Sequence, residues 1–101
     1  MLHFDIKTGG DSFECVLYPN RGLTPTIAKE VIEKLPKLLK KVSPSLVRRA
    51  KLNVESRERF LLFTVCFGRT IKPSYEKEIA KKLENLIRYV ARKHKVVATK
   101  C

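Results

Sequence analysis

Most of the ionisable side chains in this chain are basic. Among 101 residues, 22 are Lys or Arg and 10 are Asp or Glu, so the formal net charge is +12. The charge is also sorted, because residues 1–36 carry a net charge of −1 and residues 37–101 carry +13. Such a field concentrates polyanions and speeds their capture, so we expect a phosphate backbone as partner. A solvated, stable surface is the alternative, because charge alone names no ligand.

Ten basic residues form the candidate nucleic-acid-binding set, because they gather near the ends of two expected helices and at the start of an expected strand. They are Lys37, Lys40, Lys41, Arg48, Arg49, Lys51, Arg88, Arg92, Lys93 and Lys95. The helix dipole favours cations at helix C-termini, which accounts for some of these residues but not for all of them. If both helices run in the same direction over a sheet, their basic ends form one phosphate-binding surface.

Aromatic side chains would add base stacking to phosphate binding. Tyr18 and Tyr75 are the candidates, although both also fit the ends of apolar stripes, where packing at the rim of the core is the alternative. The chain has no Trp, and Phe67-Gly68-Arg69 is only superficially similar to the signature of the RNA-recognition motif. We therefore expect binding to be mostly electrostatic.

The residue types that carry enzyme chemistry form no recognisable motif. The chain has no phosphate-binding loop, dinucleotide fingerprint, zinc-protease helix or nucleophile elbow. His3 and His94 have no obvious acidic or cysteine partner in the sequence. Three carboxylates near the first expected hairpin could hold a metal, but solvated turn residues are the simpler interpretation; they are Asp5, Asp11 and Glu14. The sequence thus predicts a non-enzymatic protein with no catalytic residue, metal or cofactor.

Cysteine usage and hydropathy indicate a cytoplasmic protein. Cys15, Cys66 and Cys101 match no zinc or CxxC spacing, which favours buried or incidental thiols in a reducing compartment, although Cys101 could cross-link two chains. The longest apolar run, at 60–67, is too short to span a bilayer, and the N-terminus lacks the pattern of a signal peptide. The absence of Gln and the abundance of Lys, Glu, Ile and Leu suggest a thermophile.

Hydrophobic periodicity predicts one α+β domain over residues 1–101. Alternating patterns predict four strands, and apolar stripes at helical spacing predict two helices. The strands are at 2–7, 13–18, 50–55 and 59–67, and the helices at 24–42 and 74–93. We expect a four-stranded antiparallel sheet in ββαββα order with two helices packed on one face. The paired glycines Gly9-Gly10 should supply positive φ angles to the first hairpin, Pro36 should kink or restart the first helix, and residues 96–98 form an added strand or a frayed tail.

The fourth strand is apolar on both faces, which is typical of a strand buried on both faces. Helices on one side of a sheet cover only one of these faces, so a second copy of the chain is the simplest cover for the other. The predicted dimer or partner interface consists of Leu61, Phe63, Val65 and Phe67.

From Leu23 to the end, the predicted order is helix, hairpin and helix, preceded by a strand that ends in Val16-Leu17-Tyr18-Pro19. The last helix contains Asn85-Leu86-Ile87-Arg88-Tyr89. This order and this run resemble the small dimerising subunit of the KEOPS complex, which makes threonylcarbamoyl-adenosine in tRNA, although the spacing of the run differs by one residue. The resemblance implies an antiparallel sheet with helices on one face and a non-catalytic dimerisation subunit that helps to hold tRNA.

Together these features predict a non-enzymatic, basic nucleic-acid-binding or accessory protein, with RNA favoured over DNA and tRNA as the model ligand. It would act as a dimer or as a subunit of a tRNA-modification complex. The alternative is a protein–protein interaction module, including a small protein of viral or plasmid type, that docks through the apolar face of the sheet.

Overall fold

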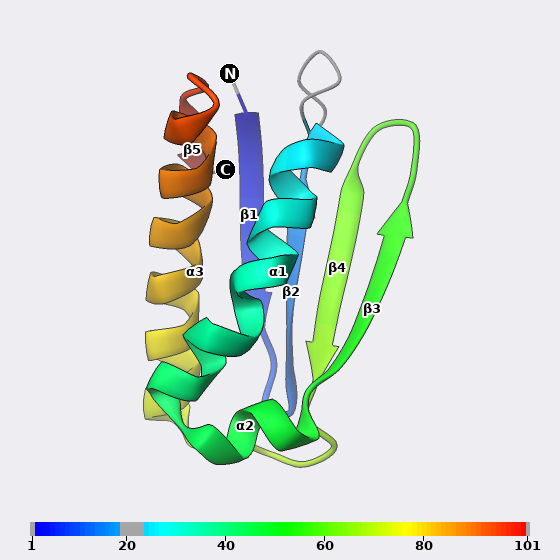
Figure 1. The fold of residues 1–101 in the computed structure, drawn as a ribbon. Helices are drawn as coiled ribbons and strands as arrows, with labels where there is room; N and C mark the ends of the chain where they lie inside the picture. Colours follow the sequence, from blue (N-terminus) through cyan, green and yellow to red (C-terminus); the bar gives the residue numbers. More distant parts are fainter. Residues whose placement is uncertain (1, 19–23, 101) are drawn as a thin grey trace.

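The computed structural model of the chain describes residues 2–18 and 24–100, so Cys101 lies outside the described residues. Two β-hairpins are each followed by helical segments that fold back over the sheet (Figure 1). The strands are β1 (Leu2–Thr8), β2 (Ser12–Leu17), β3 (Lys51–Ser56), β4 (Leu61–Cys66) and β5 (Ala98–Lys100). The helices are α1 (Thr24–Val42), α2 (Pro44–Arg49) and α3 (Pro73–Lys93). The α+β class and both predicted hairpins are therefore confirmed.

The sheet is larger than expected, because it has five strands in the order β3-β4-β2-β1-β5. The pairs β1–β2, β2–β4 and β3–β4 are antiparallel, whereas β5 pairs with β1 in parallel. The tail of the chain thus forms the added strand, slightly later than the predicted residues 96–98. The predicted purely antiparallel, four-stranded sheet was wrong in this detail.

The helical layer has one more element than the sequence predicted, so the order is ββααββαβ. The helix α1 is continuous through Pro36, so the helix does not restart there. A new helix begins instead at Pro44, the first residue of α2. At this position the missing N–H of proline costs no hydrogen bond within the helix. The first hairpin closes with the Gly9 amide donating to the Ser12 carbonyl over 2.7 Å. Neither Gly9 nor Gly10 has a positive φ, so the predicted role of this pair was wrong.

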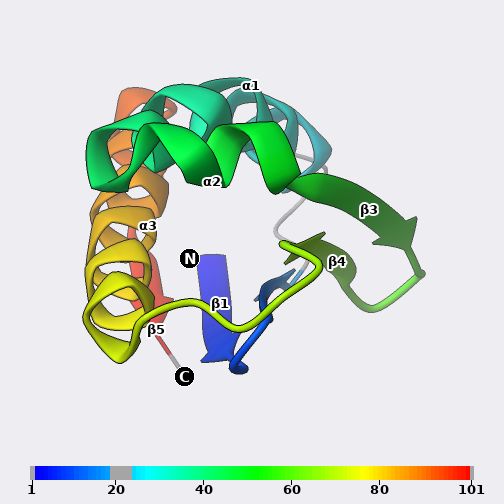
Figure 2. The same ribbon diagram turned by 90° about the horizontal axis from the view of Figure 1, so that it is seen from below.

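All three helices lie on one face of the sheet, and β3 extends beyond them at one edge (Figure 2). The core between the two layers is continuous and consists mainly of aliphatic and phenylalanine side chains. Its largest fully buried members are Phe4, Phe13, Phe63, Phe67, Leu2, Leu17, Ile27, Ile79, Leu83, Ile87, Val31 and Val65. The apolar stripes of α1 and α3 supply the helical half of this core, as their spacing predicted.

The predicted partner interface belongs to this core. Phe63 is 0% exposed, and Val65 and Phe67 are each 2% exposed, while Leu61 is half-buried against the core. Phe63, Val65 and Phe67 lie in the core between the sheet and the helices, so they are not available to a partner, and the prediction was wrong for these three residues. The opposite face of β4 carries half-buried Leu62 and Thr64 and exposed Cys66.

Candidate nucleic-acid interface

The helices α1 and α3 pack side by side in opposite directions (Figure 1). Their direction follows from the sheet, because β2 and β4 are antiparallel and each following helix folds back from the end of its strand. Contacts between the second turn of α1 and the end of α3 confirm it: Glu30 lies 3.4 Å from the Lys93 Nζ and 3.3 Å from the His94 Nε2. The expectation that both basic helix ends meet in one surface was therefore wrong.

The ten predicted residues divide between the two ends of the molecule. The first six lie where α1 ends, in α2 and at the start of β3; they are Lys37, Lys40, Lys41, Arg48, Arg49 and Lys51. The other four lie in the last turns of α3 or just beyond it; they are Arg88, Arg92, Lys93 and Lys95. The helix α3 has 21 residues, and a rise of 1.5 Å per residue makes it about 30 Å long, so the two groups do not form one patch.

Three residues of the second group make contacts within the chain that account for their position. Arg88 donates to the Ala98 carbonyl over 3.2 Å and lies 5.7 Å from the centre of the Phe4 ring, which ties β5 to the helix. Lys93 pairs with Glu30. Lys95 has a φ of 60°, the left-handed conformation that often ends a helix, and leads the chain towards β5. These contacts favour a structural role for this end of α3.

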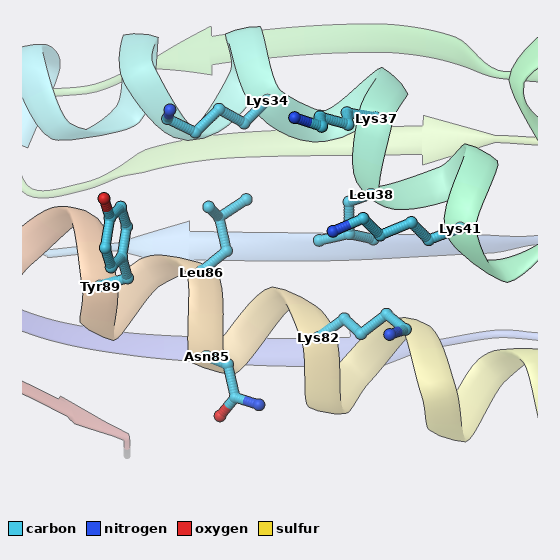
Figure 3. A pocket seen from close by; sticks show the side chains of 8 residues that line it. All are labelled: Lys34, Lys37, Leu38, Lys41, Lys82, Asn85, Leu86 and Tyr89. Carbon is cyan, nitrogen blue, oxygen red and sulfur yellow. The ribbon is translucent and has the colours of Figure 1, made fainter.

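A groove of about 360 Å³ runs between α1 and α3 (Figure 3). Its floor contains Leu38, which is 8% exposed, and half-buried Leu86. Four lysines, an amide and an aromatic ring line it: Lys34, Lys37, Lys41, Lys82, Asn85 and Tyr89. Because these residues are spaced at three or four positions on each helix, the two antiparallel helices bring them to one side. The groove adds Lys34, Lys82, Asn85 and Tyr89 to Lys37 and Lys41 of the predicted set.

The four lysines of the groove have no ion-pair partner within 4.0 Å among the residues that the structure describes. Glu33 and Glu78 each precede a groove lysine by one helical turn, yet neither makes such a pair. The groove therefore concentrates four positive charges around an apolar floor. Such a site attracts a phosphate group, because bringing a phosphate to it offsets repulsion among the lysines.

Tyr89 is the aromatic side chain best placed for contact with a ligand. It is 61% exposed and projects from α3 towards α1 at the end of the groove near Lys34 (Figure 3). The predicted stacking residues differ from it, because Tyr75 packs against the core beneath Lys72, and Tyr18 is only 39% exposed. The signal for Tyr89 in the sequence was its place in α3, two positions after the buried Ile87 and one before the buried Val90, on the flank of the apolar stripe.

The contact between Glu30, Lys93 and His94 gives His94 an acidic partner that sequence spacing did not reveal. Removal from water raises the pKa of Glu30, but the hydrogen bond to His94 and the charge of Lys93 outweigh this effect, so the pKa lies below its ordinary value.

In the core, burial and, to a lesser extent, the charge of Asp5 raise the pKa of the Cys15 thiol. Cys15 is therefore protonated at neutral pH and has no nucleophilic character.

The described residues contain no group of three or more His, Cys, Asp or Glu side chains that is placed to hold a metal ion. Of the three carboxylates near the first hairpin, Asp5 accepts a hydrogen bond from the backbone N–H of Ile6 over 3.0 Å.

No helix among residues 2–18 and 24–100 combines the length and the hydropathy that crossing a membrane requires.

No protein-family model matches the chain, and a comparison with curated proteins gave no match.

Proposed function

We propose that this chain is a non-enzymatic protein that binds nucleic acid, with RNA favoured over DNA, through the groove between α1 and α3. The observation that carries this proposal is the set of four lysines, from two helices, that line one groove and have no ion-pair partner in the part of the chain that the structure describes. A lysine ammonium binds phosphate as a point charge and needs no fixed geometry. Four such groups along about two helical turns suit a flexible chain of phosphates.

Two features support RNA as the preferred nucleic acid. The three helices of the described residues lie flat on the sheet (Figure 2), so none of them projects to enter a major groove of duplex DNA. Tyr89 exposes a ring beside the lysines, and unpaired bases that can stack on a ring are most common in RNA loops and ends. The resemblance to the small KEOPS subunit adds tRNA as the RNA to test first and an accessory role in a tRNA-modification complex.

The test is to measure binding of labelled tRNA and of duplex DNA of similar length over a series of salt concentrations. If all four groove lysines neutralise phosphates, the logarithm of the binding constant falls against the logarithm of the salt concentration with a slope of about −3 or steeper. Tighter binding of tRNA than of DNA supports the preference for RNA. Failure to bind either nucleic acid at low salt would indicate that the positive charge serves to keep the protein in solution, and would contradict the proposal.

A second candidate function is self-association through β3, which has an open edge in the sheet. Its Leu52 and Val54 are 47% and 46% exposed. Beside them lies an apolar groove of about 140 Å³; its lining comprises Ile32, Leu35, Pro36, Leu39, Val47, Ala50, Leu52 and Val65. An open edge strand with exposed apolar residues is a template for pairing with another chain.

A second copy of the chain suits this edge, because the strand is complementary to itself. Antiparallel pairing centred on Asn53 places Lys51 opposite the second copy's Glu55, and Leu52 opposite the second copy's Val54. Paired side chains share one face of the sheet, so both charges lie on the open face and both apolar groups on the helical face. Glu55 also contacts Arg57 of its own chain, and both side chains stay exposed to water.

Sedimentation equilibrium tests this self-association. The Lys51→Glu variant should weaken the dimer, because it places like charges opposite each other, and adding Glu55→Lys should restore it. Val54→Lys should give a folded monomer, since this side chain is already half exposed. A monomeric wild type at high protein concentration would rule out self-association through β3.

A further inference from the structure

We infer that the groove between α1 and α3 binds an unpaired nucleotide of a single strand, with its base stacked on Tyr89 and its flanking phosphates bound by the lysines. The inference rests on the proposed function and names the form of nucleic acid that the groove takes. Tyr89 is 61% exposed, more than any other aromatic side chain among the described residues. A ring so exposed contributes little to the core and offers a free face to a ligand.

The position of Tyr89 relative to the lysines supports a nucleotide as the ligand. The ring stands at one end of the groove and projects towards α1, on the side of Lys34, while Lys41 and Lys82 lie further along the groove (Figure 3). From Lys82 to Tyr89 the helix advances seven residues, which is about 10 Å at 1.5 Å per residue. A base on the ring therefore leaves its neighbouring phosphates within the reach of flexible lysine side chains.

The other features of the groove fit a base better than an acidic peptide. Leu38 and Leu86 give the groove an apolar floor next to the ring, which suits the flat, apolar face of a base. Asn85 lines the same groove, and its amide points away from α1 (Figure 3). Stacking on an aromatic ring accepts every base, so this site binds single strands without selecting a sequence.

The experiment compares Tyr89→Ala with wild type on three probes of equal length: a short oligouridine, an abasic strand with the same phosphates, and an RNA duplex. Loss of one stacked base should weaken oligouridine binding about tenfold, within the range measured for base–aromatic stacking. Binding of the abasic strand and of the duplex should change less than twofold, because the lysines are unaltered. Tyr89→Phe should keep the affinity of the wild type, because it retains the aromatic ring.

A second measurement uses the absence of Trp from the chain. In the Tyr89→Trp variant, the single indole should lose fluorescence on adding oligouridine and keep it on adding the abasic strand or polyglutamate. Equal affinity of Tyr89→Ala and wild type for oligouridine, with no change in indole fluorescence, would overturn the stacked base and leave the phosphate-binding function standing. Failure of wild type to bind any of the three nucleic-acid probes would overturn both. Quenching by polyglutamate would instead make the groove a general site for polyanions and would overturn the inference.

Discussion

Two adjacent parts of the contact between α1 and α3 differ in how their charges are used. Near the start of α1, Glu30 contacts Lys93 and His94 at 3.4 and 3.3 Å and joins the two helices. One turn further along α1 begins the groove, in which four lysines have no ion-pair partner within 4.0 Å among the described residues. We call the first region the clamp and the second the groove.

This difference between the clamp and the groove shows that a binding surface cannot be located by counting basic residues alone. Both regions belong to the same helices and contain similar residue types, but in the clamp a carboxylate already occupies the place of a phosphate. In the groove, no carboxylate of residues 2–18 and 24–100 lies within 4.0 Å of the lysines. Lys93, which belonged to the predicted binding set, therefore lies in the clamp, while Lys34 and Lys82, which did not, lie in the groove.

The largest effect should come from reversing charge in the groove. The double variant Lys34→Glu with Lys82→Glu removes two phosphate contacts and adds two repulsions, so affinity for tRNA at low salt should fall roughly 100-fold or more. Filter binding or fluorescence anisotropy measures the loss, and circular dichroism checks that both helices remain folded. An unchanged affinity would mean that the groove is not the phosphate-binding surface.

A charge-matched control at the end of α3 should have a much smaller effect. Arg92 and Lys95 are exposed beside the clamp, and replacing both by Glu changes the net charge by the same amount as the groove variant. Because only the long-range field is altered, we expect a loss of about threefold at low salt and less at high salt. If this variant loses as much affinity as the groove variant, then total charge and not its location governs binding.

Removing the carboxylates beside the groove should raise its affinity for tRNA and so increase the difference between the groove and the clamp. Glu33 and Glu78 each lie one helical turn before a groove lysine. Replacing both by Gln should raise the affinity for tRNA about twofold, because two exposed negative charges near the bound phosphates are lost. The same anisotropy assay measures the gain, and an affinity below that of wild type would contradict the expected geometry.

The smallest effect should come from the clamp, and it should appear in stability and not in binding. The pKa of Glu30 in the folded chain is lowered from its ordinary value of 4.5. The contribution of the clamp is therefore complete above that value and is lost as pH falls through the lowered pKa. Thermal melts should show Glu30→Gln slightly less stable than wild type at neutral pH and equal to it in strong acid. A difference that grows on acidification would contradict the sign of the shift.

The hairpins and the core could be predicted from the sequence because they depend on local alternation and on helical stripes. The strand β5 was left uncertain, since its three residues pair in parallel with the other end of the chain. The helix α2 was missed because Ser43-Pro44-Ser45 also fits the end of a helix. The opposite directions of α1 and α3 follow from the antiparallel β2–β4 pair, which periodicity alone did not establish.

The candidate site was only partly predictable, because pairing between distant residues decides which cations are free. Glu30 and Lys93 are 63 positions apart, and nothing in their local sequence indicates that they meet. Lys34 lies in the acidic part of the sequence, and Lys82 lies outside the terminal turn of α3, so neither stood out. The packing of the two helices brings both to the groove.

The most direct test of the proposal that the groove binds phosphate is the salt dependence of tRNA binding for two neutralised variants. Each lysine that contacts a phosphate adds about one to the slope of the logarithm of affinity against the logarithm of salt. Lys34→Gln with Lys82→Gln should therefore reduce the slope by about 2, while Arg92→Gln with Lys95→Gln should leave it near that of wild type. An unchanged slope in the groove variant, together with a reduced slope in the α3-end variant, would contradict the assignment of the groove.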